Sequence, residues 1–148
     1  MAFTNSLIKL ILSLILLGQT VNAVGFSPQS IGVIGHLECN GVNASGVLVK
    51  VYNKNLFYTD NLIAQGATDV NGNIRLIGTD KELLTNMNIH INIYHHCNHE
   101  SIWCARRVTV KVPTEFITKG KETADRFFDI GTHQLNEPNP EEEKDCFH

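Results

Sequence analysis

Four cysteines, Cys39, Cys97, Cys104 and Cys146, constrain this 148-residue chain more than any other feature. All four follow an apolar N-terminal segment. An even number of cysteines behind an export signal indicates two disulfides formed in an oxidising compartment. This interpretation argues against a zinc site or a catalytic thiol, and it predicts a secreted, extracellular protein.

The N-terminal segment has the pattern of a signal peptide over residues 1–23. An apolar run, Leu10–Leu17, precedes small residues that place cleavage after Ala23. Eight apolar-rich residues are too few to cross a bilayer, which takes about 20. We therefore expect no transmembrane segment in the mature chain. Residues 24–148 are enough for a single domain.

The charge balance gives no sign of a polyanionic partner. The chain carries 12 basic and 15 acidic residues, a formal net charge of −3, and removal of Lys9 with the leader makes it −4. No cluster of lysines and arginines is present. The sequence therefore argues against nucleic acid as a partner and weakens any purely electrostatic attraction to anionic lipid.

Short alternating segments separated by turn signals predict an all-β sandwich of about seven strands. In one of them Val47, Val49 and Val51 share a face. Residues 79–82 fit a capping box and predict a helical turn. The acidic tail, about residues 136–148, is expected to be irregular and solvated. The expected strands are 31–38, 46–52, 62–68, 73–78, 89–94, 107–112 and 127–135.

A hairpin register connects the strands on either side of Cys97 and Cys104. If these cysteines bridge directly, three aliphatic pairs fall on one face: Ile93 with Val108, Ile91 with Val110, and Ile89 with Val112. A slip of one residue would place valines opposite polar residues, whereas a slip of two keeps the faces. Four cysteines allow three connectivities. The register favours Cys97 with Cys104, which leaves Cys39 to pair with Cys146.

Ordered motifs give the chain a resemblance to the nematode transthyretin-like family over about residues 31–148. The motifs are Gly35-His-Leu-Glu-Cys39-Asn-Gly41, Val47-Leu-Val-Lys-Val-Tyr52, Thr68-Asp-Val-Asn-Gly72, Ile91-Asn-Ile-Tyr-His-His-Cys97, Cys104-Ala-Arg-Arg-Val-Thr-Val-Lys-Val-Pro113, Phe128-Asp-Ile-Gly-Thr132 and Asp145-Cys146. The resemblance implies a secreted, transthyretin-like β-sandwich. It implies binding roles, in which the partner is a protein receptor at a cell surface, a lipid surface or a small apolar ligand. Release by a parasite to act on a host is among the implied roles.

Relatives of the transthyretin fold include hydrolases that act on 5-hydroxyisourate, and this gives an alternative function. His36, Arg75 and His133 echo the histidines and arginine of those enzymes. The chain lacks their terminal Tyr-Arg-Gly-Ser, however, and no eighth strand is evident after Leu135. No other catalytic motif is present. We therefore expect a protein that is not an enzyme, with no cofactor. The missing last strand also argues against transthyretin-like hormone carriage.

The segment His95-His96-Cys97-Asn98-His99 invites a metal site through its three histidines. Two observations oppose it, because Cys97 is expected to be oxidised and adjacent strand residues point to opposite faces. His95 shares its face with Ile93, which predicts a partly buried histidine with a hydrogen-bonded partner such as Arg106. We therefore predict no metal site.

Two further positions are candidates for modification or contact. Asn43-Ala-Ser45 is an N-glycosylation acceptor in an expected loop. Trp103, between two cysteines, is either an exposed partner contact or a side chain packed on a disulfide. The acidic tail could meet a basic surface or a cation, but a solvated terminus is the simpler interpretation.

Overall fold

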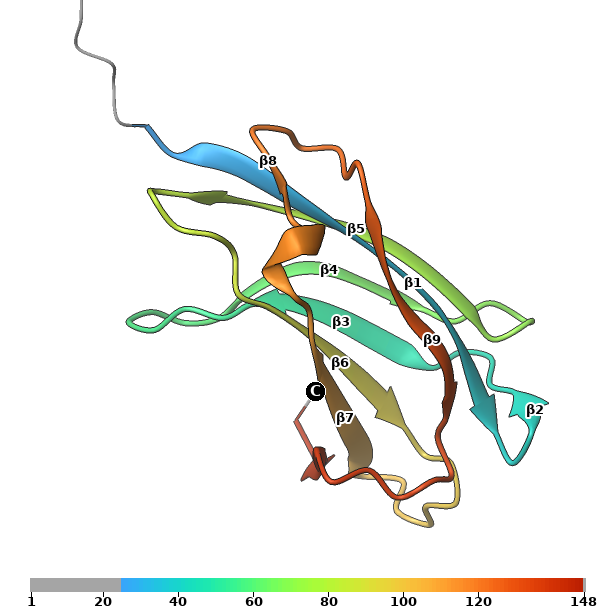
Figure 1. The fold of residues 1–148 in the computed structure, drawn as a ribbon. Coiled ribbons are helices and arrows are strands. Elements are labelled where there is room, and N and C mark those ends of the chain that lie inside the picture. The colour runs from blue at the N-terminus through green and yellow to red at the C-terminus, as the bar shows by residue number, and fades with distance from the viewer. Residues whose placement is uncertain (1–24, 148) are drawn as a thin grey trace, which may run out of the picture.

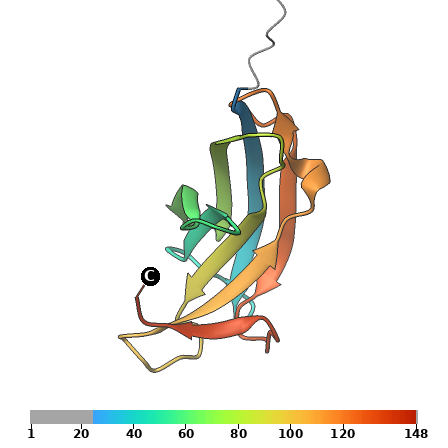
Figure 2. The same cartoon turned by 90° about the vertical axis from the view of Figure 1, so that its left-hand side faces the viewer.

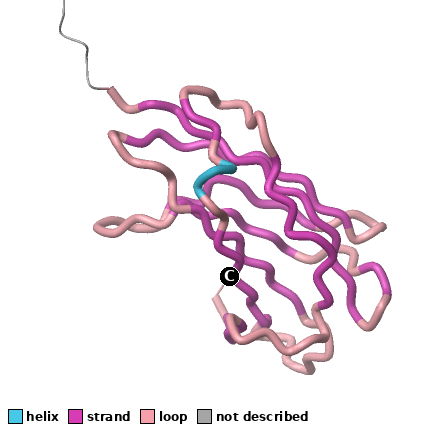
Figure 3. Tube along the Cα trace, viewed as in Figure 1, coloured by secondary structure: helices cyan, strands magenta, loops and turns pink. Residues whose placement is uncertain are grey.

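Two sheets pack face to face in the computed structural model, which describes residues 25–147 (Figures 1 and 2). The predicted signal peptide, residues 1–23, lies outside the described residues, so its cleavage stays a prediction. Figure 3 shows that strands make up most of the described chain, with one short helical turn, η2 (Thr114–Phe116). The predicted all-β sandwich is confirmed.

The first sheet is organised around the long strand β1, to which each of its other strands pairs. Strands β2, β5 and β8 run antiparallel to β1, and β9 runs parallel to it. The strands of this sheet are β1 (Ser27–Cys39), β2 (Val42–Asn43), β5 (Asn73–Glu82), β8 (Thr118–Lys119) and β9 (Phe127–Gln134).

The second sheet is antiparallel throughout and has the strand order β10-β7-β6-β3-β4. Strand β6 therefore lies at its centre, between β7 and β3. The strands of this sheet are β3 (Leu48–Asn53), β4 (Asn61–Ala67), β6 (Ile89–His95), β7 (Ala105–Lys111) and β10 (Glu142–Asp145).

The core lies between the sheets and follows the alternation of the strands. Odd-numbered residues of β1, β3 and β6 point inward because successive side chains alternate between faces. Val49 and Val51 of the predicted valine face are among these inward residues, and Val47, just before β3, is also buried. The fully buried aliphatic members of these three strands are Ile31, Val33, Leu37, Val49, Val51, Ile89, Ile91 and Ile93.

The predicted register between β6 and β7 is confirmed. Ile91 lies opposite Val110, Ile93 opposite Val108, and Tyr94 opposite Arg107. The backbone N–H of Val112 donates to the carbonyl of Ile89 over 2.9 Å, which continues the same register. The need to keep one face apolar is consistent with this pairing and excludes a slip of one residue.

The predicted helical turn at residues 79–82 is wrong, because these residues continue β5 opposite the start of β1. Glu82, which was expected to complete the capping box, and nearby Asp80 bond across the sandwich instead. Asn53 Nδ2 donates to Asp80 Oδ2 at 2.9 Å and to Glu82 Oε1 at 2.6 Å. A cross-strand partner therefore outweighs the local capping pattern.

The prediction of an irregular, solvated tail is wrong for Glu142–Asp145, which forms the edge strand β10 beside β7, whereas residues 136–141 are turns and irregular backbone. Two arginines of β7 pair with carboxylates of β10. Arg106 Nε donates to Glu142 Oε1 at 2.6 Å, and Arg107 forms ion pairs with Glu143 and Asp145. The acidic composition suggested solvation, whereas the complementary charges of β7 order the segment.

Candidate functional site

The disulfides join different cysteines from those predicted. Cys39 is bonded to Cys97, and Cys104 is bonded to Cys146. The first bond links the last residue of β1 to the start of the loop that follows β6, and so it crosses between the two sheets. Cys39 and Cys97 are both odd-numbered, and the odd-numbered residues of β1 and β6 face each other across the core. The predicted pairs Cys97–Cys104 and Cys39–Cys146 are therefore wrong, although the β6–β7 register inferred with them is right.

The loop between β6 and β7, residues 96–104, diverges from the hairpin directly after His95. A turn begins where the N–H of His99 donates to the carbonyl of His96 at 3.0 Å, with Asn98 in the left-handed region at φ 52°. Near its end, the N–H of Cys104 donates to Ser101 Oγ at 3.1 Å. The loop thus contains its own turns, and Cys97 and Cys104 are turned toward separate partners.

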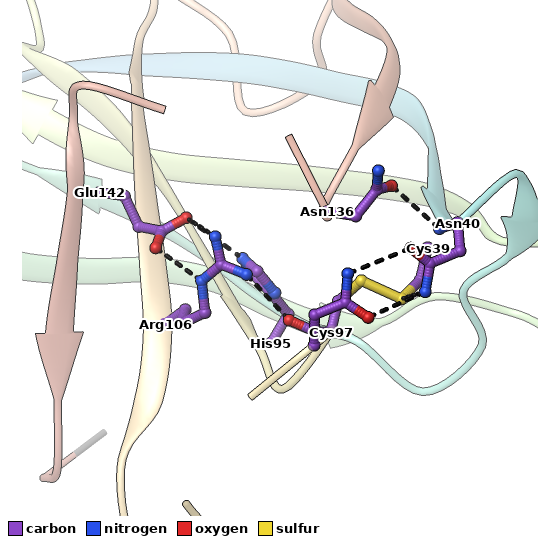
Figure 4. Close-up of a disulfide and its surroundings, with 8 residues drawn as sticks. Cys39, Asn40, His95, Cys97, Arg106, Asn136 and Glu142 are labelled. Atoms are coloured by element: carbon purple, nitrogen blue, oxygen red, sulfur yellow. Dashed lines mark hydrogen bonds and ion pairs between the residues drawn. A yellow bond between two sulfur atoms is a disulfide. The ribbon is translucent and has the colours of Figure 1, made fainter. Parts of the chain in front are cut away.

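A pair of asparagines flanks the disulfide between the sheets (Figure 4). Asn40 and Asn98 each follow a cysteine of this bond, and both adopt positive φ, 54° and 52°. Their amides bond reciprocally, with Nδ2 to Oδ1 distances of 2.9 and 3.1 Å. Asn136 Oδ1 accepts from the N–H of Asn40 at 2.9 Å. This arrangement connects β1, the β6–β7 loop and the segment before β10.

Sequence reasoning missed these asparagines as a site. The repeated dipeptide Cys-Asn was the available signal, because asparagine tolerates the left-handed conformation and its side chain offers both a donor and an acceptor.

Arg106 holds the tail strand against the disulfide-linked end. Its Nε and Nη2 donate to the two oxygens of Glu142 at 2.6 and 2.8 Å, and its Nη1 donates to the carbonyl of Cys97 at 2.8 Å. Both side chains are largely buried. A bidentate, charge-assisted pair of this kind fixes geometry as well as contributing energy.

His95 is buried beside this ion pair and is neutral (Figure 4). Burial, and then the positive charge of Arg106, lower the pKa of His95 to about 4. Glu142 Oε2 lies 3.9 Å from its Nε2, beyond hydrogen-bond distance. Burial is confirmed, but the predicted hydrogen-bonded partner is not found: among the described residues neither ring nitrogen has one.

The histidines of this segment do not converge as metal ligands. His96 donates through Nδ1 to the carbonyl of Ser101 at 3.0 Å, and its ring stacks on His99 with centroids 6.2 Å apart. His95 points instead into the space between the sheets. Across residues 25–147 no group of three histidine, cysteine or acidic side chains has an arrangement suited to a metal ion.

Trp103 and Ile102 project from the β6–β7 loop into solvent. The side chain of Trp103 is 80% exposed, which decides against the interpretation that it packs on a disulfide. Phe147, which follows Cys146, is also exposed. The loop is held at both ends, through Cys97 to β1 and through Cys104 to β10. An exposed apolar pair is thus presented on a constrained segment.

A cavity of about 350 Å³ opens beside the Cys39–Cys97 disulfide. Val47, His95 and Leu135 line it, together with both cysteines of the bond between the sheets. The residues before β3, which include Ala44 and Ser45, form part of its wall. Its volume is at the small end of the range for ligand sites.

The three residues of the hydrolase alternative do not share one cleft. Arg75 stacks on the ring of Phe127, with its guanidinium carbon 3.8 Å from the centroid, on the outer face of the first sheet. His36 lies on that face, where its Nδ1 is 3.0 Å from Asn73 Oδ1. His133 pairs with the fully buried Leu37, and strand alternation turns its side chain to the opposite, inner face.

Fold and site together define a disulfide-bonded β-sandwich that presents a constrained apolar loop. The model of the transthyretin-like family matches residues 34–113. Transthyretin-like protein 5 of Caenorhabditis elegans is 40% identical over 141 residues, which is 95% of this chain and 99% of that protein. Transthyretin-like protein 33 of the same nematode is 36% identical over 121 residues, 81% of this chain and 83% of that protein. The chain belongs to the transthyretin-like family.

Among solved structures, a 9R-lipoxygenase from Cyanothece aligns with a TM-score of 0.42 and 14% identity. The alignment covers 72% of this chain and 16% of the lipoxygenase, and it carries no argument about function. Within residues 25–147, no helix has the length and apolar character needed to span a bilayer.

Proposed function

We propose that this chain is a secreted, non-enzymatic binding domain that recognises an extracellular protein through Ile102 and Trp103. The observation that carries the proposal is the exposure of these side chains on a loop tied at both ends by disulfides. Tryptophan is enriched among residues that dominate binding energy. Constraint of the loop before binding lowers the entropy lost on association.

The experiment is affinity capture with the mature, oxidised protein offered to an extract of extracellular and cell-surface proteins. The double variant Ile102→Ser/Trp103→Ser removes the apolar pair. Val70→Ser, at an exposed position in the β4–β5 turn, is the matched control. We expect the double variant to lose at least tenfold in affinity for a captured protein and the control to retain it. Equal binding by all three proteins would refute the use of this loop.

A second candidate is carriage of a small apolar ligand, which the cavity beside the Cys39–Cys97 disulfide supports. Native mass spectrometry of the mature protein after exposure to a lipid extract tests it. A bound small molecule that is displaced by Leu135→Trp, which reduces the cavity, favours this function. Spectra that contain the unliganded protein alone count against it. The hydrolase alternative has no comparable support, since His133 is separated from the other two residues by the sheet.

Secretion and glycosylation belong to the same proposal. Asn43 lies in β2 and is exposed, as an oligosaccharide acceptor must be. Expression in a eukaryotic secretory host is expected to yield protein in the medium that begins at Val24 and loses mass on treatment with an N-glycosidase. Ser45→Ala is expected to abolish the mass loss.

A further inference from the structure

The end of the sandwich opposite the disulfides presents a second exposed apolar surface. It is named here the apolar tip and consists of Phe26, Leu56, Phe57, Tyr58, Leu83 and Leu84. Strand β6 separates the two surfaces, because the β5–β6 loop precedes it and the β6–β7 loop follows it. Figure 1 shows the β3–β4 and β5–β6 loops projecting on the left, away from the β6–β7 loop.

The β3–β4 loop supplies the most exposed part of the apolar tip. Leu56, Phe57 and Tyr58 are consecutive, and their exposed fractions are 90%, 88% and 83%. A run of three exposed apolar residues is unfavourable in water unless it serves a function. The loop is closed at its base by the ion pair of Lys54 Nζ with Asp60 Oδ2 at 2.5 Å. These residues are thereby held at the apex of a closed loop.

The β5–β6 loop adds a second apolar apex. Leu84 is 87% exposed and has a φ of 65°, a left-handed conformation that is uncommon for a bulky residue. Exposure of this apolar side chain to water is unfavourable. Backbone strain is a separate cost, and strain of this kind is found at functional positions.

Backbone pairing holds the parts of the apolar tip together. The N–H of Lys54 donates to the carbonyl of Asn88 at 2.8 Å, which joins the β3–β4 loop to the end of the β5–β6 loop. Ser27 pairs with Glu82, which brings Phe26 to the beginning of the β5–β6 loop. The two loops and the start of β1 therefore lie on one side of the molecule, which faces the viewer in Figure 2. The apolar residues of the tip are exposed there.

We propose that the apolar tip inserts into the interfacial region of a phospholipid bilayer. Three consecutive apolar side chains at one apex and a fourth at a second apex suit insertion between lipid headgroups. Tyrosine and phenylalanine place amphipathic or apolar rings at the depth of the interface. The partner is a membrane surface, and the apolar tip binds it independently of the Ile102–Trp103 loop.

The charges beside the apolar tip specify which membranes it binds. Lys54 is paired with Asp60, and Lys81 is flanked by Asp80 and Glu82. The neighbourhood therefore has no excess of positive charge. Apolar burial drives the insertion, so zwitterionic headgroups suffice and anionic lipid adds nothing.

The test is flotation of the mature, oxidised protein with phosphatidylcholine vesicles. Leu56→Ser/Phe57→Ser removes two apex residues, and Ile102→Ser/Trp103→Ser is the matched control at the opposite end. We expect the apex variant to partition at least tenfold more weakly. We expect the control to partition as strongly as the wild type. We also expect the wild type to bind equally well to vesicles that contain about 30% phosphatidylglycerol.

A fluorescence measurement locates the insertion. Trp103 is the single tryptophan of the chain, so Phe57→Trp in a Trp103→Phe background gives a reporter in the apolar tip. Its emission is expected to shift to the blue on phosphatidylcholine vesicles.

Absence of flotation by the wild type, equal flotation of the apex variant, or binding only to anionic vesicles overturns the proposal. Dimerisation lost in the apex variant, in sedimentation without vesicle binding, overturns it in favour of self-association.

Discussion

Cys104 and Cys146 lie directly opposite each other, one residue beyond the last paired residues of β7 and β10. Ala105 pairs with Asp145, and the Cα atoms of the two cysteines are 4.0 Å apart. The disulfide therefore closes the ladder between β7 and the edge strand β10. It also fixes the end of the loop that presents Trp103.

Loss of this disulfide is expected to free the tail strand. The bond spans 42 residues, and the chain-entropy relation gives about 4 kcal/mol for a loop of that length. Cys104→Ser/Cys146→Ser should lower the free energy of unfolding by about that amount in urea titration. Hydrogen exchange should accelerate in residues 142–145 before the rest of the second sheet. Retention of slow exchange there would show that the ion pairs alone hold β10.

The Arg106–Glu142 pair is expected to contribute far more than an exposed pair. Glu142→Gln leaves a largely buried guanidinium without its counter-charge and should cost about 2 kcal/mol in the free energy of unfolding. The control is Asp125→Asn, which removes the exposed pair with Lys121 and should change stability by less than about 0.5 kcal/mol. Equal effects of the two variants in urea titration would contradict the assigned difference in burial.

His95 makes stability depend on pH below neutrality. Its pKa is lowered to about 4 in the folded protein from an ordinary value of 6.5, so the unfolded chain binds more protons between these values. Stability is therefore lost as the pH falls from 6.5 to 4, by up to about 3 kcal/mol for this group. Urea titration from pH 7.5 to 4 should show a shallower decline in His95→Phe. Parallel declines would exclude His95 as a source of the dependence.

The asparagine pair contributes through both conformation and hydrogen bonding. Asn98→Ala loses the reciprocal amide bonds and places alanine at a φ of 52°, for an expected cost of about 2 kcal/mol. Asn98→Gly loses the same bonds but tolerates the backbone, so about 1 kcal/mol is expected. Thermal unfolding of both variants measures the difference. Equal losses of stability in the two variants would show that the left-handed backbone at residue 98 does not contribute.

The strands and one register could be predicted because their signals are local. Alternating valines in β3, and the isoleucines of β6 opposite the valines of β7, exclude a one-residue slip because it would break the continuous apolar face. For the site, the sequence indicated Trp103 and the buried position of His95.

The rest depended on distant partners. The acidic tail becomes a strand because Arg106 and Arg107 lie beside it, and residues 79–82 extend β5 because β1 and Asn53 meet them. The reciprocal bonding of Asn40 with Asn98 requires two turns that are 58 residues apart in the chain.

The sequence by itself determined that this protein is a β-sandwich with two disulfides, since hydrophobic alternation and cysteine number are properties of the chain. Only the tertiary structure decided which cysteines join. Cys39 and Cys97 meet because facing sheets bring their inward positions together, and Cys104 meets Cys146 because charge pairing aligns β10 with β7. The same packing decided which apolar residues remain exposed, because burial depends on what the rest of the chain covers.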